Sequence, residues 1–133
     1  MWITVDPRSS TPIYQQVMDA VKASIARGLL PQGARMPSVR EVATSNTLNH
    51  NTVAKAYQEL EREGIIEVVR GRGTFVAAIK ARPDRTRRIQ DLKHAMHHLL
   101  IEAHYIPLSG RETLELFQEV VEAWGGEKGE SPA

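Results

Sequence analysis

The sequence predicts an α+β fold that is mostly α, with five helices and one short β-hairpin. Three observations predict it: apolar residues recur at helical spacing in four segments, two segments begin with a helix capping box, and two β-prone runs flank a glycine-containing turn. Of the 133 residues, 41% are hydrophobic, 25% are charged and none is cysteine. This composition is typical of a globular protein without disulfides or thiolate metal sites.

The first helix is expected over residues 12–27, after a short β-prone run at residues 3–5. Thr11 is the expected N-cap, with Pro12 at the first helical position, and Gly28 suits the residue after the last turn. One stripe of this helix should face a core, because apolar residues recur at every fourth position: Ile13, Val17, Val21 and Ile25.

A helix-turn-helix pattern follows. Ser38 and Glu41 form a capping box that begins a short helix over about residues 39–45. Small polar residues then indicate a turn over residues 44–49, and Asn49 is the expected N-cap of a second helix. The apolar face of that helix consists of Val53, Ala56, Tyr57 and Leu60. A short turn and a polar N-terminus on the second helix are typical of DNA-binding helix pairs.

Two β-prone runs, residues 65–69 and 74–76, flank the sequence Arg70-Gly71-Arg72-Gly73. This arrangement predicts a hairpin with two arginines at its tip. A hairpin in this place is the wing of a winged helix-turn-helix. Residues 1–78 are therefore expected to form a winged helix-turn-helix DNA-binding domain.

Residues 79–133 are expected to form a linker and a two-helix dimerisation tail. The helices are predicted over residues 84–104 and 111–124, the second after a capping box of Ser109 and Glu112, with fraying from residue 125. Two such helices have too few apolar residues to form a core alone, so their stripes should be buried on a partner chain or on the first domain. The predicted dimerisation residues are Leu92, Met96, Leu99, Leu100, Leu114, Phe117, Val121 and Trp124.

Charge is divided unevenly along the chain. Basic residues outnumber acidic ones over the first 80 positions, and acidic residues outnumber basic ones from position 89 onward. This asymmetry favours a polyanion-binding first domain. The sequence shows no signal peptide and no membrane-spanning stretch, so we expect a cytoplasmic protein without a membrane partner.

The motifs of the first 78 residues resemble the GntR family of bacterial transcriptional regulators. The short helical remainder is similar to the YtrA subfamily, whose small C-terminal part serves dimerisation. Two positions depart from the family pattern: Asn46-Thr47 replace a Leu-Gly-like pair, and His50 stands where Arg or Pro is common. The matching stretches are Thr11 to Gln16, Pro37 to Ala43, Leu48 to Val53, Ala56 to Gly64 and Gly71 to Val76.

The resemblance implies a sequence-specific regulator that binds double-stranded DNA as a homodimer. It further implies a repressor on an inverted-repeat operator, with targets near transporter genes. No enzymatic activity and no cofactor are expected, and a small-molecule effector is left open.

Candidate DNA-binding residues lie at the second helix of the pair and on the hairpin. Short polar side chains at a helix N-terminus can bond base edges or phosphates in the major groove, and arginines on a hairpin tip suit the minor groove. By resemblance, Arg40 contacts DNA and Ser38 lies at a phosphate. Competing interpretations are that Asn49 only caps its helix, that Arg40 and Arg72 are merely solvated charges, and that Tyr57 belongs to the core. The predicted set is Ser38, Arg40, Asn49, His50, Asn51, Thr52, Lys55, Arg70, Gly71, Arg72, Gly73 and Thr74.

The tail histidines raise an alternative function. His94 and His98 are four residues apart on one helical face, with His97 and His104 nearby, which is a spacing that suits a divalent ion and a metal-dependent hydrolase. No third ligand stands at a fixed spacing, and no nucleophile elbow or phosphate loop accompanies them, so we expect no metal. A further alternative is a protein-interaction module that uses the helical tail.

Overall fold

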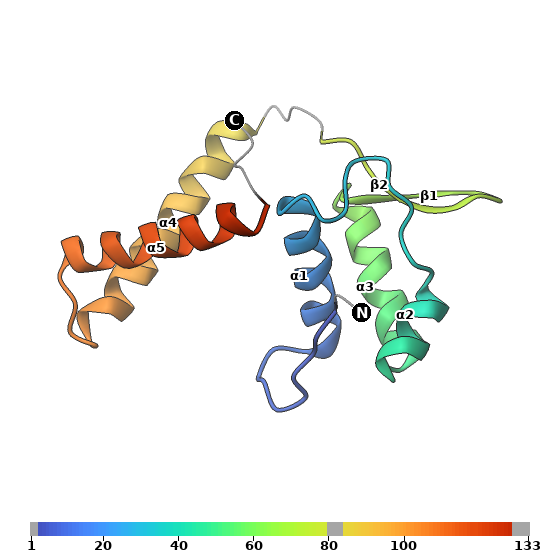
Figure 1. The fold of residues 1–133 in the computed structure, drawn as a ribbon, viewed down its shortest axis with the longest axis horizontal. Helices are drawn as coiled ribbons and strands as arrows, with labels where there is room; N and C mark the ends of the chain where they lie inside the picture. The colour runs from blue at the N-terminus through green and yellow to red at the C-terminus, as the bar shows by residue number, and fades with distance from the viewer. Residues whose placement is uncertain (1–2, 80–83, 129–133) are drawn as a thin grey trace. The chain divides into compact units, whose positions relative to one another are not determined.

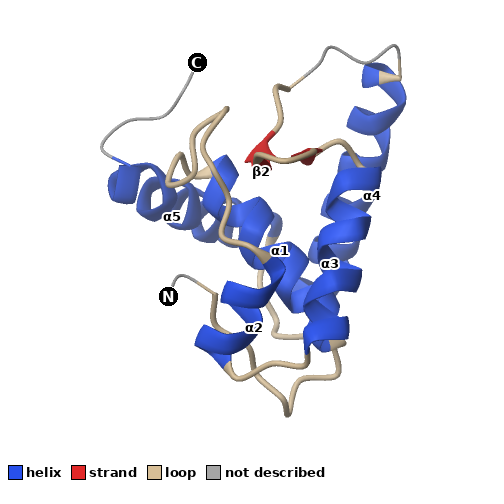
Figure 2. Cartoon of the chain, turned by 90° about the vertical axis from the view of Figure 1, so that its right-hand side faces the viewer, coloured by secondary structure: helices blue, strands red, loops and turns tan. Residues whose placement is uncertain are grey.

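The computed structural model describes residues 3–79 and 84–128. The chain divides into two compact units, residues 1–79 and residues 80–133 (Figure 1). The first holds α1 (Ile13–Ala26), α2 (Val39–Asn46), α3 (His50–Arg62), β1 (Ile66–Val69) and β2 (Gly73–Val76), and the second holds α4 (Arg85–His104) and α5 (Gly110–Lys128). Figure 2 shows how little of the described chain is strand, which confirms the mostly helical α+β fold.

The start of α1 differs from the prediction. Pro12 is the N-cap residue and provides no side-chain cap, so the helix begins at Ile13. Thr11 does not cap it, because its backbone is held in the preceding loop, where its carbonyl accepts a 2.9 Å hydrogen bond from Gln16 Nε2. The expected glycine after the helix is confirmed, since Gly28 has a φ of 82°.

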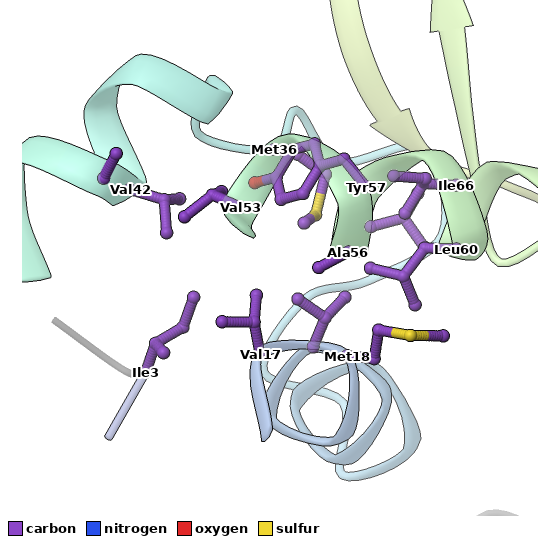
Figure 3. Packing of buried hydrophobic residues seen from close by; sticks show 13 residues of the cluster. Ile3, Val17, Met18, Met36, Val42, Val53, Ala56, Tyr57, Leu60 and Ile66 are labelled. Carbon is purple, nitrogen blue, oxygen red and sulfur yellow. The ribbon is translucent and has the colours of Figure 1, made fainter. Parts of the chain in front are cut away.

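The β-prone run at residues 3–5 does not form a strand. Ile3 instead inserts into the core of the first unit (Figure 3). The β propensity of this run reflects its apolar side chains, and burial satisfies that preference without strand pairing.

The core of the first unit lies between α1, α2 and α3 (Figure 3). The predicted face of α3 is confirmed, since all four of its apolar residues are buried. On α1 only the two central positions of the predicted stripe are buried, and Ile13 and Ile25 are half-buried. Fully burying one Val or Leu side chain contributes about 1.5–3 kcal/mol. The largest of the fully buried side chains are Leu60, Ile66, Val17, Val21, Val42 and Val53.

The turn between α2 and α3 is shorter than predicted, because α2 continues to Asn46. Thr47 follows in the left-handed conformation, with φ 53° and ψ 50°. The Leu48 N–H then donates to the Ala43 carbonyl at 2.8 Å. Asn46, at the apolar position of the family pattern, is half-buried, and its Nδ2 donates to the Val42 carbonyl at 2.9 Å. This local bond satisfies a polar side chain beside the core.

β1 and β2 form the predicted antiparallel hairpin, each strand one residue from its expected start. A third segment, not predicted from the sequence, pairs with β2. The Met36 N–H donates to the Thr74 carbonyl at 2.7 Å, and the Val76 N–H donates to the Ala34 carbonyl at 2.9 Å. Arg35 and Phe75 are bridge partners in this ladder. The loop before α2 is thereby fixed to the hairpin.

The second unit is a pair of helices in contact with each other. The predicted capping box begins α5: the Ser109 N–H donates to Glu112 Oε1 at 2.9 Å, and the Glu112 N–H donates to Ser109 Oγ at 3.0 Å. The predicted fraying from residue 125 is wrong for residues 125–128, because α5 continues to Lys128. Residues 80–83, within the predicted linker, lie outside the described residues. None of the helices in the described ranges is long and apolar enough to cross a membrane.

Candidate nucleic-acid interface

The N-terminal turn of α3 presents polar side chains to solvent. Asn49 is the N-cap, and its Oδ1 accepts a 2.8 Å hydrogen bond from the Asn51 N–H. His50 and Asn51 are exposed, and Thr52 is half-buried. Since the amide oxygen of Asn49 is engaged in capping, the side chain of Asn51 is the better placed of the two amides to read a base edge.

Lys55 lies one turn further along α3. Its Nζ is 4.0 Å from the centre of the Tyr14 ring on α1. An exposed cation–π contact of this kind contributes about 0.5–1 kcal/mol. Lys55 is itself exposed, so its charge is fixed in position while the ammonium remains open to solvent.

The start of α2 is a complete capping box. The Ser38 N–H donates to Glu41 Oε1 at 2.9 Å, and the Glu41 N–H donates to Ser38 Oγ at 3.0 Å. These bonds favour the carboxylate and hold the pKa of Glu41 below its ordinary value. The Ser38 hydroxyl still has its own hydrogen to donate, and Arg40 is exposed on the first turn.

Tyr57 ties α3 to the start of α2. Its ring is in the core, as expected, and its hydroxyl donates a 2.6 Å hydrogen bond to the Pro37 carbonyl. Burial raises the pKa of Tyr57 above its ordinary value, which favours the protonated hydroxyl that donates this bond. The contact fixes the capping residue of α2 relative to the middle of α3.

The hairpin tip carries the two predicted arginines. The Arg72 N–H donates to the Val69 carbonyl at 2.9 Å and closes the turn, in which Gly71 has a φ of 79° that favours glycine. Arg70 and Arg72 are exposed. Figure 1 shows the hairpin projecting beyond the three helices of its unit. Thr74 is half-buried in the ladder, so it lies away from the exposed tip.

Arg35 is a basic residue that the sequence reasoning did not single out. It lies on the strand-like segment beside β2, and its guanidinium Nε and Nη2 are each 3.4 Å from the point that a Cβ on Gly73 would occupy. The signal available in the sequence was the charged Arg35 directly before the apolar Met36. That signal is weak, because two residues do not establish a strand alternation.

A family model described as "Bacterial regulatory proteins, gntR family" matches residues 13–76. The chain is also 42% identical over 127 residues to the HTH-type transcriptional repressor YtrA of Bacillus subtilis (strain 168). That alignment covers 95% of this chain and 98% of the relative. The chain belongs to the GntR family. Its relatives are transcriptional regulators and not enzymes, so the hydrolase alternative is wrong.

Two solved structures extend the comparison. YtrA from Sulfolobus acidocaldarius, a GntR-family transcription factor, is similar with a TM-score of 0.60 and 36% identity, over 73% of this chain and 99% of that one. The DNA-binding domain of AraR in complex with its operator ORX1 is similar with a TM-score of 0.50 and 29% identity, over 56% of this chain and 92% of that one. This GntR chain is therefore a DNA-binding transcriptional regulator with a winged helix-turn-helix.

The helical tail of this GntR regulator exposes a large apolar surface. The eight predicted dimerisation residues have exposed fractions from 41% at Trp124 to 67% at Leu114. The structure adds Ile89, Leu116 and Val120 to this exposed set. Ala103 is the one buried residue of α4. Exposed apolar surfaces of this kind are typical of interaction sites.

Two of the tail histidines of the GntR chain contact each other. The His94 and His98 rings meet edge to face, with centroids 5.4 Å apart. Among the described residues, no three His, Cys, Asp or Glu side chains converge on one point.

Proposed function

We propose that this GntR regulator is a homodimeric repressor that binds an inverted-repeat operator. The observation that carries the proposal is the exposed polar N-terminal turn of α3, fixed beside the start of α2 by the Tyr57–Pro37 hydrogen bond. In a helix-turn-helix, this turn of the second helix enters the major groove. The bond supports a docking in which α2 and α3 reach the DNA as one rigid surface.

In this docking, base edges are read from the N-terminus of α3. The amide of Asn51 can pair with adenine, and Arg40 can pair with guanine or a phosphate. The Ser38 hydroxyl and the free N–H groups of the first helical turns suit phosphate oxygens. The remaining residues of this surface position α3 on the DNA more than they read its sequence. They are Asn49, His50, Thr52 and Lys55.

The wing is proposed to lie in the adjacent minor groove. Arg70 and Arg72 are exposed on a turn that projects from the domain, and arginine is favoured where the minor groove is narrow. Gly71 and Gly73 allow the backbone to come close to the sugar-phosphate chain, and Thr74 supports the turn from the ladder.

Dimerisation is proposed to occur through α4 and α5. Their apolar side chains remain largely exposed in the single chain, and a second copy would bury the same residues by twofold symmetry. The two linked DNA-binding domains then bind half-sites about one helical turn apart or slightly more. The second DNA-binding domain adds affinity through its high effective concentration.

Repression follows from occupancy of a promoter, and the Bacillus subtilis relative is itself a transcriptional repressor. A transporter operon as the target remains a prediction from the YtrA resemblance, as does a cytoplasmic location. A small-molecule effector is left open.

Selection of bound sequences from random duplex DNA with the full chain tests this proposal. We expect enrichment of two half-sites in inverted orientation. The Asn51→Ala variant, selected in parallel, should lose preference at one position in each half-site. Enrichment of a single unrepeated site would contradict the dimeric arrangement, and no enrichment at all would contradict sequence-specific binding.

A further inference from the structure

Arg35 projects from the outer face of the small sheet. Its segment pairs with β2, where Phe75 is its bridge partner. The next residue, Met36, is 2% exposed and faces the core. Successive side chains of an extended chain point to opposite faces, so Arg35 points away from the core. Its side chain is exposed, in agreement with that direction.

The guanidinium of Arg35 passes over β2 at Gly73. Nε and Nη2 are each 3.4 Å from the position of a Cβ at residue 73, so a side chain there would be in van der Waals contact with the guanidinium. Gly73 also has a φ of 121°, which side-chain-bearing residues rarely adopt. The glycine keeps this place open directly beside Arg72, one of the two arginines of the wing turn.

Arg35 also lies three residues before Ser38, the N-cap of α2. Its charge contributes to the lowered pKa of Glu41, after the larger effect of the Ser38 hydrogen bonds. The Glu41 carboxylate already accepts a hydrogen bond from the Ser38 N–H. Arg35 forms no ion pair and no side-chain hydrogen bond with any residue that the structure describes. A guanidinium has five N–H donors in a planar fork, and the Arg35 side chain is exposed to solvent.

We propose that Arg35 contacts a DNA phosphate between the N-terminus of α2 and the wing, and that Gly73 positions its guanidinium for this contact. The inference rests on the proposed docking of α2, α3 and the wing. It adds a phosphate contact between the helix pair and the wing. A planar fork matches the geometry of phosphate oxygens, which a point charge matches less well. Such a contact fixes the register of the protein on DNA and carries no base preference.

The test is the salt dependence of DNA binding by full-length Arg35→Gln. The probes are a labelled duplex of mixed sequence, about 30 base pairs long so that it spans two half-sites, and the duplex selected by the natural protein. Arg62→Gln is the matched control, because Arg62 lies at the far end of α3 and pairs with Glu59. Arg35→Lys keeps the charge and removes the fork, and thermal unfolding is followed for every variant.

We expect Arg35→Gln to bind both duplexes about five- to tenfold more weakly at moderate salt, with a salt slope lower by about one. Arg35→Lys should keep the slope and recover part of the affinity, and Arg62→Gln should match the natural protein. An unchanged slope for Arg35→Gln overturns the proposal even if affinity falls, because a purely structural role does not change counterion release. If the natural protein still selects an operator in that case, the proposed function stands and only the role of Arg35 fails.

Discussion

The Tyr57 hydroxyl lies 2.6 Å from the Pro37 carbonyl oxygen, so a residue in the middle of α3 is bonded to the residue directly before the cap of α2. The hydroxyl is the one polar group on the buried face of α3. Its partner is a backbone acceptor of the loop that also pairs with β2. This hydrogen bond fixes α2 and α3 relative to each other.

Replacement of Tyr57 by Phe should lower the free energy of unfolding by about 1 kcal/mol, because the Pro37 carbonyl loses its donor. Operator affinity should also fall, since the start of α2 becomes less firmly placed. Urea unfolding at fixed protein concentration and fluorescence anisotropy measure the two effects. Tyr14→Phe is the control, because its ring remains under Lys55 and its hydroxyl has no hydrogen bond in the described chain. Equal stability of both variants would show that the Tyr57 bond contributes nothing.

Replacement of Thr47 by Gly should raise the free energy of unfolding by about 1 kcal/mol. Thr47 has a φ of 53°, and a β-branched residue is strained in the left-handed conformation that glycine adopts freely. The matched control is Thr44→Gly inside α2, where the same change should be mildly destabilising. Chemical denaturation measures the free energy of unfolding of both variants. A lower value for Thr47→Gly than for the natural protein would contradict the proposed backbone strain at Thr47.

Replacement of Glu41 by Gln should reduce the acid sensitivity of the protein. The pKa of Glu41 is lower in the folded chain than its ordinary value. The resulting stabilisation is fully present above the ordinary value and is lost as the pH falls through the folded-state pKa. Gln keeps an acceptor for the Ser38 N–H but does not titrate. Unfolding free energies measured from about pH 7 downward should therefore fall less steeply for the variant, and parallel curves would refute this role.

Replacement of Leu92 by Glu should convert the dimer to a monomer, because a charge in an apolar interface is costly to bury. Ile101→Glu is a close control: both residues are 57% exposed on α4, and nine positions place them on opposite sides of the helix. Sedimentation at several concentrations should show a monomer for the first variant and a dimer for the second. Two dimers, or two monomers, would place the interface elsewhere.

Local signals predicted much of the fold. Both capping boxes occur as predicted from Ser38 with Glu41 and from Ser109 with Glu112, since a cap depends on a few neighbouring residues. The apolar face of α3 followed from periodicity in the same way. The error at Thr11 arose because a hydrogen bond from Gln16 in the following helix engages its backbone.

Non-local pairing explains what the sequence did not show. The ladder between Met36 and Thr74 joins residues far apart in the chain, and no short sequence pattern predicts it. The position of Arg35 beside β2 depends on this ladder, so the sequence alone did not indicate it. The candidate residues at the N-terminus of α3 and on the wing are exposed as a DNA-binding surface requires, and their individual contacts remain predictions.

The most direct test of sequence reading by α3 is the affinity of Asn51→Ala for the selected operator and for a scrambled duplex. Gln58→Ala is the control, because Gln58 is an exposed amide nearly two turns further from the N-terminus of the same helix. We expect Asn51→Ala to lose about 1–3 kcal/mol on the operator and little on the scrambled duplex. Gln58→Ala should bind both like the natural protein. Operator affinity of Asn51→Ala equal to that of Gln58→Ala would contradict sequence reading by this turn of α3.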